Sequence, residues 1–134
     1  MTLRLNRWTG CAVWLSMILI IGCDTNGETL SSTQLAAEVN FGDSYMIAKS
    51  DPPRLEARDL YLIVQYGGGC ADHEFDVRSH IQNDTSYVWL QHDGNGDSCE
   101  AYLTDPLHRR VLLSVLESQH IILLGPEDQS FTLR

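Results

Sequence analysis

The chain has 134 residues, of which 43% are hydrophobic, and a formal net charge of −9 at pH 7. All 18 acidic residues follow residue 22, whereas two of the nine basic residues precede it, so the part after residue 22 carries a charge of −11. A surface this acidic repels phosphate backbones and anionic lipid head groups, which argues against nucleic-acid binding. The length after residue 22 suffices for one domain and not for two.

The N-terminus has the pattern of a signal peptide. Arg4 and Arg7 are the only charged residues before an uncharged apolar stretch over residues 11–21. That stretch is shorter than the ~20 residues that a helix needs to cross a bilayer. A basic start, a short apolar segment and a small residue before a cleavage point are typical of an exported chain.

The apolar stretch ends in Ile20-Ile21-Gly22-Cys23, which resembles the lipobox of bacterial lipoproteins. The resemblance implies cleavage before Cys23 and acylation of that cysteine, because two or more acyl chains give stable membrane anchoring. An ordinary signal peptide with a chance cysteine, or an uncleaved anchor, is the alternative. We therefore expect a lipid-anchored protein of the cell envelope that faces the periplasm or the exterior. Asp24 resembles an inner-membrane retention signal of enteric bacteria, and the choice of membrane stays open.

The next segment predicts a tether. Residues 24–34 are polar, with Gly, Ser, Thr and Asn throughout, as in flexible linkers. A single helical turn is expected over residues 35–41. The predicted organisation is a signal peptide over 1–22, the lipidated cysteine and tether over 23–40, and a β domain over 41–134.

From Tyr45 onward the hydrophobic pattern has a period of two, which predicts strands. Residues 60–66 give the strongest strand, expected to be central and covered on both faces. Residues 93–96 predict a hairpin loop, Asp105-Pro106 predicts a turn, and residues 111–116 fit either a helix or a strand. The other predicted strands are 44–49, 73–78, 86–92, 99–103, 120–124 and 130–133. About seven or eight short strands predict an all-β fold, a single small β-sandwich or barrel-like domain.

Two of the four cysteines remain for the folded domain. Cys11 lies in the leader and Cys23 is the expected lipidation site, which leaves Cys70 and Cys99. An even pair of cysteines in an exported domain predicts a disulfide. The bond would close a loop of about 30 residues and stabilise the fold by roughly 3–4 kcal/mol.

The run Gly67-Gly68-Gly69 lies directly before Cys70. Glycine permits positive φ and close backbone approach, so the run predicts a bulge or tight turn that directs Cys70 toward its partner. A phosphate-binding loop would need a Lys-Ser/Thr pair and a following helix, and neither follows here.

Two metal-binding patterns compete with these interpretations. Cys70, His73, His92 and Cys99 could form a Cys₂His₂ zinc set, but zinc needs the two thiolates that a disulfide would use. A catalytic Cys–His pair would need a free thiolate for the same reason.

The second pattern, Asp93-x-Asn95-x-Asp97, resembles the opening of a calcium loop. It fails further along, where Ser98 replaces the glycine and Thr104 replaces the closing glutamate. We expect no metal and no cofactor. The candidates, if a metal does bind, are His73, His92, Asp93, Asn95 and Asp97.

Residues 67–75 and 92–101 together resemble a family of small exported bacterial lipoproteins with the patterns GGGCxxHxF and HDxxxDxCEA. The resemblance implies that the two cysteines act together and that the nearby histidines belong to the same end of the fold. It brings no activity. We expect a non-catalytic binding or scaffolding module whose protein or small-molecule partner the sequence does not identify. The alternatives are a calcium- or zinc-binding envelope lipoprotein and, with less support, a hydrolase.

Overall fold

A computed structural model describes residues 31–134 of the chain. The predicted signal peptide, the lipobox with Cys23, and the first part of the predicted tether lie outside these described residues. Among residues 31–134, no helix has the length and apolar character needed to traverse a membrane.

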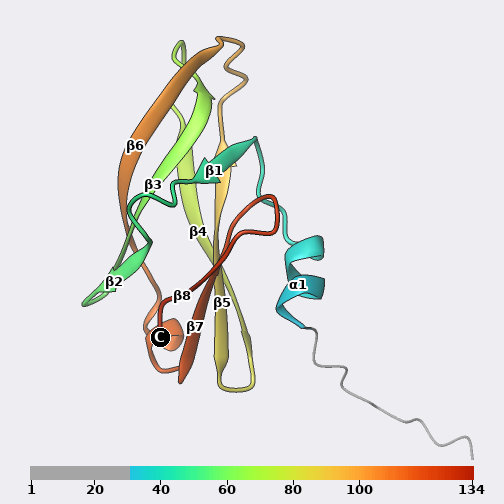
Figure 1. The fold of residues 1–134 in the computed structure, drawn as a ribbon, viewed down its shortest axis with the longest axis vertical. Helices are drawn as coiled ribbons and strands as arrows, with labels where there is room; N and C mark the ends of the chain where they lie inside the picture. Colours follow the sequence, from blue (N-terminus) through green and yellow to red (C-terminus); the bar gives the residue numbers. More distant parts are fainter. Residues whose placement is uncertain (1–30) are drawn as a thin grey trace, which may run out of the picture.

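The described residues form eight strands in two four-stranded sheets, with two short helices (Figure 1). In the first sheet, β3 is central: it pairs with β1 and β2 along one edge and with β6 along the other. The second sheet has the order β4-β5-β7-β8. The strands are β1 (Tyr45–Ile47), β2 (Arg54–Glu56), β3 (Asp59–Gly68), β4 (Glu74–Gln82), β5 (Thr85–Asp93), β6 (Ala101–Arg110), β7 (His120–Leu124) and β8 (Ser130–Thr132). The predicted all-β fold is confirmed, and of the two expected forms, sandwich and barrel, the structure has the sandwich.

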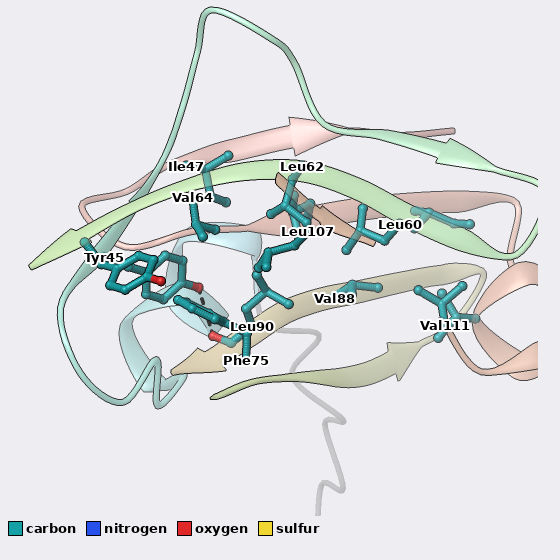
Figure 2. Close-up of a cluster of buried hydrophobic side chains, with 14 residues drawn as sticks. Tyr45, Ile47, Leu60, Leu62, Val64, Phe75, Val88, Leu90, Leu107 and Val111 are labelled. Carbon is teal, nitrogen blue, oxygen red and sulfur yellow. Dashed lines mark hydrogen bonds between the residues drawn. The ribbon is translucent and has the colours of Figure 1, made fainter. Parts of the chain in front are cut away.

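The core lies between the two sheets (Figure 2). Leu60, Leu62 and Val64 alternate along β3 and are fully buried, and they face Val88 and Leu90 of β5. Burial of this apolar surface is the main favourable contribution to folding. The alternation in the sequence therefore determines which face of each strand points inward.

One buried hydroxyl joins the two sheets. The Tyr45 side chain enters the core from β1 and donates a hydrogen bond of 2.8 Å to the Leu90 carbonyl of β5. Burial raises the pKa of Tyr45, so the phenol keeps its hydrogen and remains a donor at neutral pH. The contact satisfies the polar group that this large side chain carries into the core.

The strand predicted over residues 60–66 is central in its sheet, but only one of its faces is buried. The outer residues Tyr61, Ile63 and Gln65 are half-buried because no element of the described chain covers that face completely. An antiparallel sheet can leave one face toward water, which accounts for the difference.

One predicted turn and one predicted hairpin are wrong. Asp105-Pro106 lies inside β6, where Pro106 pairs with Ile63. Proline fits because β6 is an edge strand, and its missing N–H can point away from the only neighbour. Residues 93–96 do not close a hairpin either, because β5 and β6 belong to different sheets and the segment crosses between them.

The C-terminal region agrees better with the prediction made from the sequence. Strands β7 and β8 form the expected antiparallel hairpin, and β7 also pairs in parallel with β5, a connection that the sequence did not predict. The ambiguous residues 111–116 contain the short helix α2 (Leu113–Leu116), whose Val115 is fully buried.

A helix also lies in the segment predicted as a tether. Helix α1 (Ser32–Glu38) begins with a capping box, in which Ser31 Oγ accepts from Gln34 N and Gln34 Oε1 accepts from Ser31 N. Leu35 is buried against Tyr87 and Leu124. The packed part of the described chain therefore includes residues before position 41, because this helix places one apolar side chain on the second sheet.

We predict that Leu62→Ala lowers the free energy of unfolding by about 2–5 kcal/mol, because it leaves a cavity in a fully buried part of the core. Leu112→Ala is the matched control, since 66% of Leu112 is exposed, and its effect should stay within about 0.5 kcal/mol. Urea unfolding followed by circular dichroism measures both changes. Equal effects of the two variants would contradict the assignment of the core.

Candidate functional site

Asp97 is the centre of a polar cluster at one end of the sandwich. Its Oδ2 accepts hydrogen bonds from the backbone N–H groups of Gly69, Cys70 and Ala71 at 2.8, 2.8 and 2.9 Å. Its Oδ1 accepts from the N–H of Cys99 at 2.8 Å. Only 1% of the Asp97 side chain is exposed, so these donors replace the water that a carboxylate would otherwise bind.

The glycines before Cys70 allow the backbone N–H groups of residues 69–71 to point toward Asp97. Gly69 has φ = 117°, a value that residues with side chains rarely adopt. A Cβ atom at Gly68 would collide with the imidazole of His73. The sequence therefore needs glycine at both positions, so that three successive N–H groups can turn toward one carboxylate oxygen.

The structure places Cys70 and Cys99 at disulfide-bonding distance, with their Cα atoms 5.8 Å apart. Their two backbone N–H groups both bond to Asp97, so the cysteine pair and the carboxylate form one unit. Their sulfur atoms and an Asp97 oxygen lie within 4.8 Å of one another. The predicted pairing of the two cysteines is therefore geometrically present.

Two histidines extend the cluster into a chain of hydrogen bonds. His73 Nε2 lies 3.1 Å from Asp97 Oδ2, and His73 Nδ1 lies 2.8 Å from His92 Nε2. His92 Nδ1 in turn lies 3.2 Å from the backbone carbonyl oxygen of Asp43. The structure thus brings together His73, His92 and Asp97, three of the residues that the sequence singled out.

Aromatic rings enclose the histidines. His92 stacks on Phe75 with ring centroids 4.2 Å apart and an angle of 2° between the planes. Tyr66 lies against His73 at 4.6 Å and donates a hydrogen bond to the Asp105 carboxylate. Burial and this carboxylate raise the pKa of Tyr66 to about 12. The histidines are therefore held in fixed orientations by neighbours that stay uncharged.

Asp93 and Asn95 form the adjacent turn and do not join Asp97. Asp93 Oδ1 accepts from Asn95 N at 2.8 Å, and Asn95 Nδ2 donates to the carbonyl of Asp72. Asp97 instead accepts from the backbone N–H groups of residues 69–71. The Asp93 and Asp97 carboxylates of the calcium-like pattern are therefore directed to different backbone N–H groups.

Asp43 is a member of the cluster that the sequence analysis missed. Its Oδ2 accepts from Gly94 N at 2.8 Å, and its carbonyl oxygen faces His92. A Cβ atom at Gly42 would collide with the His92 carbonyl, so Gly42 permits the two segments to meet. The pair Gly42-Asp43 was the available signal, but nothing in the sequence indicated that it would contact a strand almost 50 residues further on.

The electrostatics of the cluster favour an ionised Asp97. The N–H groups of Cys99 and Cys70, followed by His73, hold the pKa of the Asp97 carboxyl well below its usual range. Burial lowers the pKa of His92, and the positive charge that His73 can carry acts in the same direction. The cluster thus combines a fixed anion with a histidine that resists protonation.

Two hollows flank His92 on the surface. One has a volume of about 360 Å³, and the other, of about 280 Å³, also borders His73, Asp97 and Cys99. The first is lined by Gly42, Asp43, Glu74, Asp76, Arg78, Gln91, His92 and Asp93. His92 and Asp43 of the polar cluster therefore line both depressions.

The hydrogen bonds limit what the cluster can do chemically. Among the described residues, every buried side-chain nitrogen and oxygen has a hydrogen-bond partner. The facing nitrogens of His73 and His92 bond to each other, and the outer nitrogens bond to Asp97 and to the Asp43 carbonyl. A general base would need a lone pair directed at a nucleophile or substrate. The arrangement is suited to holding three chain segments together.

Comparisons with protein-family models, with curated proteins and with solved structures find no match to this chain.

We predict that Asp97→Asn lowers the melting temperature at pH 7 and flattens its dependence on pH in acid. The pKa of Asp97 is depressed in the folded state, so the stabilisation is complete above the unfolded-state value of about 3.9 and is lost as the pH falls below it. Circular dichroism melts between pH 7 and pH 2 measure the effect. Glu100→Gln changes an exposed acid beside the same loop and should retain the acid dependence of the wild type.

Proposed function

We propose that this chain is a lipid-anchored binding or scaffolding module of the bacterial cell envelope, without catalytic activity. The lipobox-like residues 20–23 support the anchor, and the acidic surface favours neutral or basic partners over anionic ones. The two polar depressions beside His92 offer binding area next to a rigid end of the domain.

The observation that carries the proposal is the Cys70–Cys99 pair and its shared carboxylate. Disulfides persist in oxidising compartments outside the cytoplasm. A pair at bonding distance, with both backbone N–H groups fixed by Asp97, is what an exported domain of this size would use to stabilise one end. The feature agrees with the export that the N-terminal pattern independently predicts.

The saturated hydrogen bonds of the cluster support the non-catalytic part of the proposal. His73 and His92 have no nitrogen directed at a serine, threonine or thiol among the described residues. If the two sulfurs are bonded, no free thiolate remains to act as a nucleophile or to bind zinc.

The anchor predicts that the chain, expressed with its own leader in a bacterial host, separates into the detergent phase and begins at an acylated Cys23. Cys23→Ala should stay unacylated and uncleaved, whereas Cys11→Ala should behave like the wild type. Phase separation with a nonionic detergent and mass spectrometry of the N-terminus measure this. An unmodified wild-type chain in the soluble intracellular fraction would contradict the proposed lipid anchor.

The cysteine pair predicts that the unreduced domain has no titratable thiol and that reduction lowers the free energy of unfolding by roughly 3–4 kcal/mol. Thiol titration in denaturant and urea unfolding measure the two effects. The variant with both Cys70→Ser and Cys99→Ser should match the reduced wild type. Two reactive thiols, or a melting temperature raised by zinc or calcium, would favour the metal-binding alternative, because a ligand specific to the native state stabilises it.

A further inference from the structure

The chain of hydrogen bonds through His73 and His92 ends in an acceptor on both sides. An ionised carboxylate and a backbone carbonyl can only accept, and they are the end groups here, on Asp97 and Asp43. Three contacts, at 3.1, 2.8 and 3.2 Å, join the four groups. Three contacts need three hydrogens, but two neutral imidazoles carry only two.

A pair of neutral histidines would leave one contact without a hydrogen. Two lone pairs would then face each other, either between His73 and His92 at 2.8 Å or between one of them and its acceptor. No water fits between nitrogens at that distance. Only 4% of the His73 side chain and 3% of His92 are exposed, so water cannot provide a hydrogen bond to the facing lone pairs. Buried groups without a partner are strongly unfavourable.

Protonation of Asp97 could supply the missing hydrogen, but its surroundings oppose it. Both carboxylate oxygens already accept backbone N–H groups, from residues 69–71 and from Cys99. Hydrogen bonds of this kind favour the charged form of a carboxyl. The third hydrogen therefore belongs to the two imidazoles.

We propose that His73 and His92 together hold one proton more than two neutral imidazoles carry, and that this proton locks three distant segments of the chain together. The segments are the loop around Asp43, the Gly-rich loop that ends at His73, and the crossing segment that contains Asp97. The proposal does not depend on lipid anchoring or on the nature of any partner.

The charge resides mainly on His73. This imidazole lies beside the Asp97 anion, whereas His92 faces a neutral carbonyl and stacks on the uncharged Phe75 ring. His92 is then the neutral form with its hydrogen on Nδ1, which it donates to the Asp43 carbonyl. Burial, which lowers the pKa of His92, supports this assignment.

The proton-dependent link between these three segments is weakened both in base and in acid. Loss of the shared proton in base removes one of the three hydrogen bonds. A second proton in acid would place two cationic rings with nitrogens 2.8 Å apart. The lock is therefore complete only while the pair holds a single extra proton, which gives a window bounded on both sides.

The surroundings of the pair contain more negative than positive charge. Tyr45 and Tyr66 face the rings from β1 and β3 and are neutral at ordinary pH, because burial raises the pKa of both. The other charged or titratable groups that face the pair, or line a hollow with one of its members, are Asp43, Glu74, Asp76, Arg78, Asp93, Asp97, Arg109 and Arg110. Five carboxylates outnumber three arginines, and this balance favours retention of the extra proton.

Nitrogen NMR of the full chain, ¹⁵N-labelled at histidine and purified in detergent micelles, tests the proposal. The exposed His80, His108 and His120 act as internal references. At about pH 8, above the ordinary pKa of histidine, we expect both nitrogens of His73 to carry hydrogen and His92 to carry it on Nδ1 alone. Five histidines that titrate together, or a neutral His73 at that pH, would overturn the proposal.

Two variants distinguish the effect of the extra proton from the effect of side-chain packing at position 92. Gln at position 92 can accept from His73 Nδ1 and donate to the Asp43 carbonyl, so His92→Gln should leave both nitrogens of His73 protonated at about pH 8. His92→Leu removes both the acceptor and the donor, so His73 should no longer carry hydrogen on both nitrogens at about pH 8. Retention of the doubly protonated His73 in His92→Leu would contradict the lock, and the wild-type measurement decides the question even where a variant does not fold.

Discussion

The burial of one carboxylate constrains the whole end of this domain. Asp97 has almost no contact with water, so its charge must be compensated by protein donors. Four backbone N–H groups and His73 provide that compensation. The positive φ of Gly69, the approach of the two cysteines and the orientation of the histidines all follow from the need to bring these donors to a single side chain.

The sequence predicted the sandwich because its core strands alternate cleanly. Alternate positions are buried along β3 at Leu60, Leu62 and Val64 and along β5 at Val88 and Leu90, and that period is sufficient to predict strands and inward faces. It does not specify which strands pair. The parallel contact of β5 with β7 and the passage of Pro106 through β6 depend on neighbours that are distant in sequence, so local turn signals gave the wrong result there.

Most members of the candidate site could be predicted from the sequence, but Asp43 and the geometry of the site could not. The spacing of Cys70, His73, His92 and Cys99 suggested that these residues meet, and the structure places them at one end. The pattern around Asp97 suggested a calcium loop, because Asp and Asn at alternate positions also occur in such loops. The direction of the carboxylate, toward the Gly-rich segment, depends on a tertiary approach that no local spacing encodes. The part played by Asp43 is hidden for the same reason.

The long outer strands β4 and β6 each leave one edge without a partner strand in the described chain. If the proposed anchor holds copies on one membrane, those copies would meet far more often than copies in free solution, and exposed edges would allow them to join into extended sheets. Along β4, the exposed side chains of Glu74, Asp76 and Arg78 put charge on that border, and Pro106 interrupts the donors of β6. Crowded copies would therefore tend to stay separate, with their ends free to meet other molecules.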